Sequence, residues 1–166
     1  MPEPKTNLVF DIHIYVDNLV GPESSWPRIQ ELRPSTRNAS ADCVSIMFYD
    51  GPRDYALFAS PHIIHNATRI LRDAGLSADL INGHINDLLE VISETGGAVV
   101  EPATNRDRGI GDFEDNQILN LAAAVDALLI ISDDTDLTPL SPWNGRLILG
   151  PHEFVRRHVS ANRRRR

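Results

Sequence analysis

The sequence of 166 residues contains little cysteine and no long apolar segment. Cys43 is the only cysteine, which excludes an internal disulfide and a cysteine metal cluster. No apolar run approaches the roughly 20 residues that a membrane-spanning helix needs, and the N-terminus lacks a basic segment followed by an apolar one. These absences favour a cytoplasmic protein that is not anchored in a membrane.

The motifs of several enzyme classes are also missing. The chain has no G-x-S-x-G sequence, which argues against a Ser-His-Asp hydrolase of that kind. Residues 109–111 (GIG) lack the third glycine of a dinucleotide-binding turn and do not directly follow a predicted strand. Residues 11–13 (DIH) lack the second acid of a D-x-D phosphatase motif. Nucleotide-cofactor binding and a phosphatase or signalling domain are therefore the weaker alternatives.

Basic residues are concentrated near one end of the chain. There are 16 Lys and Arg against 23 Asp and Glu, a net charge of −7. Arg156, Arg157 and residues 163–166 supply six of the basic residues, which leaves 10 against 23 elsewhere, a balance of −13. An acidic body argues against nucleic-acid binding unless the acids hold cations. The tail, residues 156–166, is expected to be disordered, with a phosphate-binding arm as the alternative.

Short apolar runs alternate with helical patterns along the chain. Ser60 and Pro61 predict the start of one helix, and Ser77 predicts the start of the next. This alternation predicts one α/β domain over residues 1–155, a three-layer α/β/α sandwich around a parallel sheet. A long loop is expected over residues 21–40, which contain three prolines. Strands are predicted at residues 8–10, 55–59, 98–100, 128–131 and 146–149, and a short final helix at 151–155.

Three aspartates are predicted to meet at one edge of this sheet. Asp11 and Asp134 follow apolar strands, and Asp115 lies on the core-facing stripe of the helix that leads into the second of these strands. Ligands bind at the carboxyl edge of open parallel sheets. Carboxylates brought together repel one another, and Mg²⁺ or Mn²⁺ removes that conflict. The spacing therefore predicts a metal site suited to hydrolysis at phosphorus.

The same acids also have an ordinary structural explanation. Asp112 would cap a helix, Glu114 and Asp115 would complement the positive end of that helix, and residues 133–136 would form a turn. This explanation is adequate for each acid alone. It is less adequate for the three aspartates together, because each flanks a buried element on the same predicted edge.

The segments around these acids resemble PIN-domain proteins. Residues 112–116 (DFEDN) and 130–137 (IISDDTDL) are similar to the family's D-P-[DE]-D-N and I-V-[TS]-G-D-x-D-L patterns, which flank an apolar helix. Residues 145–154 (GRLILGPHEF) resemble the family's closing strand and proline-led helix, and residues 8–11 (LVFD) resemble its first strand. The resemblance covers nearly the whole chain and is weakest in the predicted loop.

The resemblance implies a PIN-like sandwich and a Mg²⁺- or Mn²⁺-dependent endoribonuclease that cleaves RNA with an ion-activated water. Asp11, Asp115 and Asp134 match the catalytic, metal-binding acids, and Asp136 matches the auxiliary acid of the D-x-D pair. Ser132 matches the hydroxyl residue that orders the loop. Many bacterial members are VapC-like toxins, so the expected partners are an RNA substrate, an antitoxin and a second copy of the chain.

Two positions depart from the family pattern. His13 stands where Asn, Ser or Thr is usual, and Asn66 stands where a helical glutamate is expected. An amide oxygen still coordinates a hard cation but carries no charge, and Asp133, at a common glycine position, would return a carboxylate nearby. Two functions therefore stay open: a metal-dependent ribonuclease, or a catalytically impaired PIN-fold module that binds RNA or protein.

Overall fold

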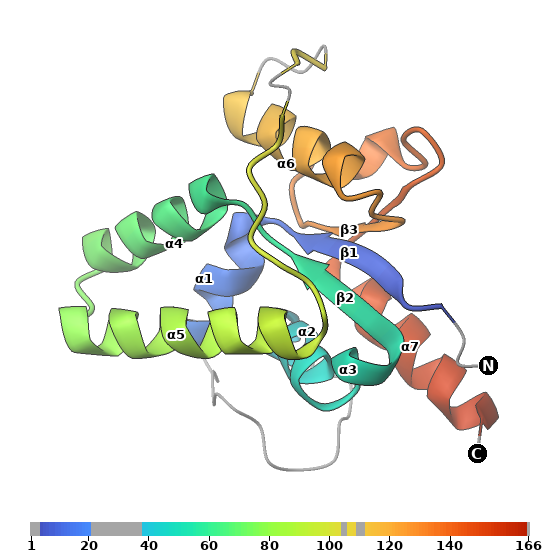
Figure 1. The fold of residues 1–166 in the computed structure, drawn as a ribbon, viewed down its shortest axis with the longest axis horizontal. Coiled ribbons are helices and arrows are strands. Elements are labelled where there is room, and N and C mark those ends of the chain that lie inside the picture. The colour runs from blue at the N-terminus through green and yellow to red at the C-terminus, as the bar shows by residue number, and fades with distance from the viewer. Residues whose placement is uncertain (1–3, 21–37, 104–105, 109–111, 166) are drawn as a thin grey trace.

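The computed structural model describes residues 4–20, 38–103, 106–108 and 112–165 (Figure 1). Residues 21–37 of the predicted loop lie outside this described part. The remaining three, from Asn38 on, cap and begin a helix. In chain order the elements are β1 (Thr6–Phe10), α1 (Ile12–Val20), α2 (Ala39–Tyr49), α3 (Gly51–Asp54), β2 (Tyr55–Phe58), α4 (Pro61–Asp73), α5 (Ala78–Glu94), α6 (Phe113–Ala124), β3 (Leu129–Ile131), the 3₁₀ turn η1 (Thr138–Leu140), β4 (Leu147–Leu149) and α7 (Pro151–Arg165).

The four strands form one parallel sheet in the order β2-β1-β3-β4. β1 is a central strand, and its residues Leu8, Val9 and Phe10 are fully buried. An apolar run without alternation is expected for a strand that is covered on both faces. Phe10 pairs with Ile131 of β3, so the residues that follow these two strands emerge side by side.

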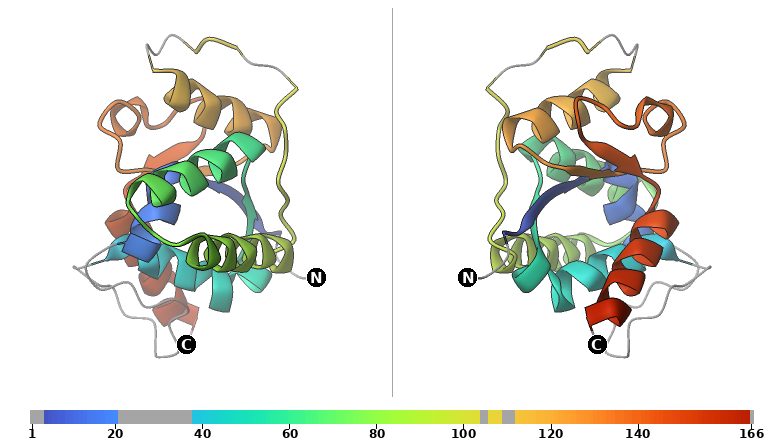
Figure 2. Two further views of the ribbon diagram at one scale, coloured as in Figure 1. Left: turned by 90° about the vertical axis from the view of Figure 1, so that its left-hand side faces the viewer. Right: turned by 90° about the vertical axis from the view of Figure 1, so that its right-hand side faces the viewer.

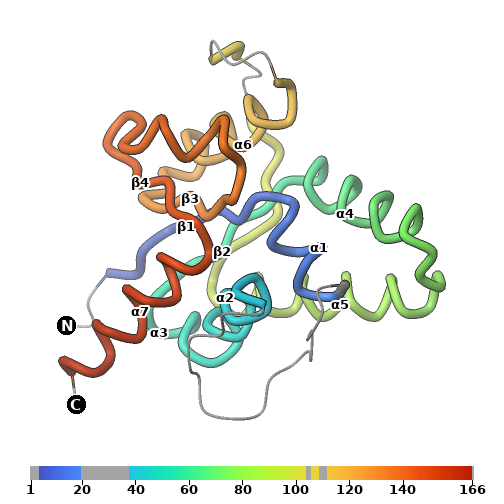
Figure 3. The backbone as a smooth tube through the Cα atoms, turned by 180° about the vertical axis from the view of Figure 1, so that it is seen from behind, coloured from blue at the N-terminus to red at the C-terminus, as the bar shows by residue number. Residues whose placement is uncertain are grey.

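Helices cover both faces of this sheet. α5 and α6 lie in front of the strands in the view of Figure 1, and α2 and α7 lie in front of them when the molecule is seen from behind in Figure 3. The side views in Figure 2 show the strands between these helical groups. The predicted three-layer α/β/α sandwich with a parallel sheet is therefore confirmed. Among the described residues, no helix combines the length and apolarity needed to cross a membrane.

Helix α1 was not predicted from the sequence. Ile12, Ile14 and Val16 alternate with other residues, which is a strand-like spacing. In the structure Tyr15 and Asn18 are buried as well, because α1 packs against several elements at once, including α2 and α4. A helix that is enclosed on several sides does not show one apolar stripe.

The predicted strand at residues 98–100 is reduced to a single bridge. Val99 pairs with Ala59 in parallel, just beyond the end of β2. Ala59 donates to the carbonyl of Ala98 at 3.2 Å and accepts from the N–H of Val100 at 2.8 Å. Two hydrogen bonds around one residue do not make a ladder, so the sheet has four named strands in the described part of the chain.

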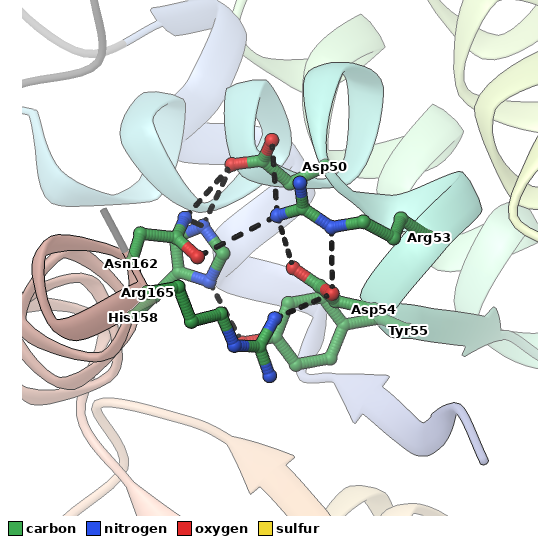
Figure 4. Close-up of polar contacts among 7 residues, drawn as sticks. All are labelled: Asp50, Arg53, Asp54, Tyr55, His158, Asn162 and Arg165. Atoms are coloured by element: carbon green, nitrogen blue, oxygen red, sulfur yellow. Dashed lines mark hydrogen bonds and ion pairs between the residues drawn. The ribbon is translucent and has the colours of Figure 1, made fainter. Parts of the chain in front are cut away.

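Helix α7 is longer than predicted. We expected a helix ending at Val155 and a disordered tail, but α7 continues to Arg165. His158 explains the difference, because its buried ring contacts the Tyr55 hydroxyl at 2.9 Å and an Asp50 carboxylate oxygen at 2.8 Å (Figure 4). Arg165 adds a 3.1 Å contact to the Asp54 carboxylate. The expectation of disorder was wrong for residues 156–165, since acids of α3 and its flanks hold the helix, and residue 166 lies outside the described part of the chain.

The predicted helix starts agree with the structure. The Ser60 side chain accepts from the N–H of Ile63, and the Ser77 side chain accepts from that of Leu80. α4 and α6 both begin near the end of the sheet where β1 passes into α1 (Figure 1). The first turns of these two helices therefore lie at the carboxyl edge of the strands.

Candidate metal centre

Asp11 occupies the position directly after the central strand. Its N–H donates to the carbonyl of Ile131 at 2.9 Å, which extends the pairing of β1 with β3. Its carboxylate accepts the Ile12 N–H and the Ser132 hydroxyl, both at 2.7 Å. Burial raises the pKa of Asp11, and the hydrogen bonds from Ser132 and Ile12 act in the opposite direction. The Asp11 carboxylate is thus fixed by the backbone and by one buried hydroxyl.

Ser132 links Asp11 to Asp134. The Ser132 hydroxyl donates to Asp11, and its oxygen accepts the N–H of Asp134 at 3.0 Å. Asp134 in turn accepts the N–H of Asp136 at 2.8 Å, which forms a tight turn after β3. Asp134 is half-buried, whereas Asp136 is exposed. A single side chain therefore sets the relative position of two of the three aspartates.

Asp115 enters the site from the first turn of α6. Asp112 caps this helix by accepting the N–H groups of Glu114 and Asp115. Asp115 is 2% exposed, and its Oδ2 atom is buried without a hydrogen-bond partner. This burial, followed by the negative charge of Asp134, raises the pKa of Asp115 to about 7. Helix capping explains Asp112 but leaves the partnerless oxygen of Asp115 unexplained.

The three aspartates converge as the sequence predicts. Asp11, Asp115 and Asp134 each offer one carboxylate oxygen, and these atoms all lie within 4.8 Å of one another. They line a cleft of about 170 Å³ at the carboxyl edge of the sheet. An all-oxygen donor set with an orphaned buried oxygen fits a hard divalent cation such as Mg²⁺ or Mn²⁺.

The auxiliary residues divide into two groups. Asn66 and His13 line the cleft with the aspartates, as predicted. Asp133 and Asp136 are exposed and do not line it, so the structure does not bring them to the three aspartates. The suggestion that Asp133 returns a carboxylate to the site was wrong.

Comparison with protein-family models, curated proteins and solved structures finds no match for this chain. The functional interpretation therefore depends on the geometry of the cleft and on the residues that line it.

Sequence reasoning missed Glu114, which lines the cleft, and His62, which contacts Glu114. Glu114 was interpreted as a helix-end acid within the DFEDN segment and was given no part in the site, and His62 was not considered. The His62 ring nitrogen Nε2 lies 2.6 Å from the Glu114 carboxylate, and Asn66 contacts both groups. His62 and Asn66 are four residues apart on α4 and so share one face of the helix, which is the one signal that could have linked them.

Proposed function

We propose that this chain is a Mg²⁺- or Mn²⁺-dependent endoribonuclease that hydrolyses phosphodiester bonds of RNA at the Asp11, Asp115 and Asp134 cleft. The observation that supports the proposal most is the approach of three carboxylate oxygens within 4.8 Å. Like charges at this separation are costly unless a cation or protons neutralise them. The elevated pKa of Asp115, about 7, is the expected consequence when no cation is bound.

The residues of the cleft have complementary tasks in this proposal. Asp11, Asp115 and Asp134 would hold the ion, and Ser132 keeps two of them in position. A bound divalent cation lowers the pKa of water and stabilises negative charge at phosphorus. Arg69 also lines the cleft with its side chain about half exposed, which suits contact with an RNA phosphate at the rim.

The direct test is RNA cleavage by the purified chain with Mn²⁺, with Mg²⁺ and with EDTA. We expect cleavage only with the divalent cations, and a loss of at least about 100-fold in Asp11→Asn and Asp115→Asn, as when a charge-stabilising group is removed. Asp126→Asn is the matched control, because its side chain is 89% exposed and its φ of 52° suits asparagine. Cleavage that survives both cleft substitutions would contradict the proposal.

A non-catalytic PIN-fold module that binds RNA or protein is the second candidate. Asn66 favours it, because a neutral amide lines the cleft where the family resemblance leads us to expect an acid. RNA binding without divalent-dependent cleavage would select this candidate.

The motif resemblance extends the proposal to biological context. It supports a cytoplasmic toxin that is neutralised by an antitoxin and that forms homodimers. Growth arrest on expression of the chain, relieved in Asp115→Asn, is the result expected of such a toxin. Normal growth on expression of an active ribonuclease would count against the toxin assignment while leaving the nuclease assignment in place.

A further inference from the structure

The carboxylate of Glu114 is held by two side chains from a different helix. Asn66 of α4 lies with its Nδ2 atom 3.0 and 3.1 Å from the two Glu114 carboxylate oxygens. His62, one turn earlier on α4, has its Nε2 atom 2.6 Å from the same carboxylate. The ring of Phe113 packs edge-on against the His62 ring, with centroids 5.5 Å apart. Glu114 is therefore fixed in one place, although its side chain is 42% exposed.

Complementing the helix dipole does not require these contacts. A glutamate in the first turn of α6 stabilises the helix from any solvated position. Only 7% of the Asn66 surface is exposed, so its amide is shielded from solvent and contacts Glu114 and His62 instead. Ordering a glutamate side chain costs rotamer entropy, and an arrangement that does so beside a cleft is typical of a binding site.

The Glu114 carboxylate keeps capacity for a further ligand. A carboxylate has about four lone-pair positions. The contacts from Asn66 and His62 use at most three of these, and only one of them involves Oε1. Glu114 lines the same cleft as Asp115, its neighbour in the chain, whose buried Oδ2 atom has no partner. Glu114 and Asp115, neighbours on one helical turn, thus both line the cleft with unused oxygen atoms, and Glu114 lies outside the group of three aspartates whose oxygen atoms approach within 4.8 Å.

We infer that Glu114 is a further cation-binding carboxylate of this cleft, held on the α4 side by Asn66 and His62. The inference deepens the proposed function and rests on it. The charge that Asn66 does not supply comes from Glu114, across a 3.0 Å hydrogen bond. Asn66 and His62 are positioning residues in this arrangement, because they act on the cation through Glu114.

The test is Mn²⁺ binding to the full chain by isothermal titration calorimetry, with RNA cleavage measured in parallel. Glu114→Gln keeps the shape of the side chain and removes its charge, and we expect Mn²⁺ affinity to fall about 10- to 100-fold. The control Glu94→Gln changes an exposed acid on α5 and should bind Mn²⁺ like the wild type. Circular dichroism establishes that each variant is folded.

Two further variants test the placement of Glu114. His62→Ala should weaken Mn²⁺ binding several-fold, whereas His65→Ala, an exposed histidine on the same helix, should not. The double variant Asn66→Glu with Glu114→Gln supplies a carboxylate from α4 near the position of the Glu114 carboxylate. It should recover most of the Mn²⁺ affinity that Glu114→Gln loses. A double variant as weak as Glu114→Gln would overturn the placement.

The outcomes separate this inference from the proposed function. The nuclease assignment stands if the wild type binds Mn²⁺ and cleaves RNA, and if Asp115→Asn loses both properties. If Glu114→Gln then binds Mn²⁺ with unchanged affinity, the inference about Glu114 is overturned. If the wild type binds no Mn²⁺, both are overturned together.

Discussion

Ser132 donates a 2.7 Å hydrogen bond to the carboxylate of Asp11, although 121 residues separate them in the chain. The bond joins the residues that follow two neighbouring strands, β1 and β3. Because the Ser132 oxygen also accepts the N–H of Asp134, one buried hydroxyl orients two carboxylates of the cleft. The arrangement makes Ser132 a positioning residue of the proposed metal site.

Ser132→Ala should weaken the metal site without removing a ligand. The substitution takes away the hydrogen bond that lowers the pKa of Asp11, so that pKa should rise further. We expect a Mn²⁺ affinity about 10- to 100-fold lower, and a cost of about 1 to 3 kcal/mol in stability from the unsatisfied buried oxygen. Calorimetry with Mn²⁺ and denaturant unfolding measure the two effects. Ser93→Ala, on the exposed side of α5, should change neither quantity.

The pKa of Asp115, about 7, predicts that metal binding depends on pH. A carboxyl group must lose its proton to bind a divalent cation, so binding competes with protonation below pH 7. We expect Mn²⁺ affinity to rise by up to about tenfold per pH unit below pH 7 and to level off above it. Titrations between pH 5.5 and pH 8.5 measure this dependence. An affinity that does not change across this range would contradict the elevated pKa.

Asp115 should also reduce the stability of the metal-free protein at high pH. Its pKa lies at about 7 in the folded chain and near 3.8 when unfolded, so the folded state binds more protons between these values. The free energy of unfolding should therefore fall as pH rises from about 4 to 7. Asp115→Asn should be more stable than the wild type at pH 8 in EDTA, by on the order of 2 kcal/mol. Glu94→Gln, at an exposed position on α5, should match the wild type.

The sequence predicted the features that depend on local patterns. Ser60, Ser77 and Asp112 are helix caps because their side chains bond N–H groups two or three residues ahead. The convergence of Asp11 with Asp134 was predictable as well, since parallel strands of one sheet end at the same edge. These inferences need only the chain direction and the periodicity of apolar residues.

The remaining features depend on how distant elements are placed. The contact between Glu114 and Asn66 joins residues 48 apart, and no periodicity reports the distance between α4 and α6. The docking of His158 on Asp50 spans 108 residues, so a polar, arginine-rich end of the chain was mistaken for a disordered tail. Contacts between polar side chains leave no apolar pattern in the sequence, which is why both were missed.

Substitution by alanine should lower the stability of the protein at Gly97 and raise it at Gly83. A Cβ atom on Gly97 would lie 1.7 Å from the carbonyl oxygen of Leu57, so the backbone would have to move, at a cost of about 2 kcal/mol or more. Gly83 lies inside α5, and its added Cβ would meet no atom within 4 Å. Gly83→Ala should therefore stabilise the protein by about 0.5 to 1 kcal/mol. Thermal unfolding of the two variants measures this contrast.

His158 should contribute more to stability than any exposed residue of α7. Its buried ring contacts the Tyr55 hydroxyl and the Asp50 carboxylate, and both would lose a partner in His158→Ala (Figure 4). We expect a loss of about 2 to 4 kcal/mol from the cavity and the unpaired polar groups, measured by denaturant unfolding. His152→Ala, exposed on the same helix, should have almost no effect. Equal stabilities of the two variants would mean that α7 is not held by this contact.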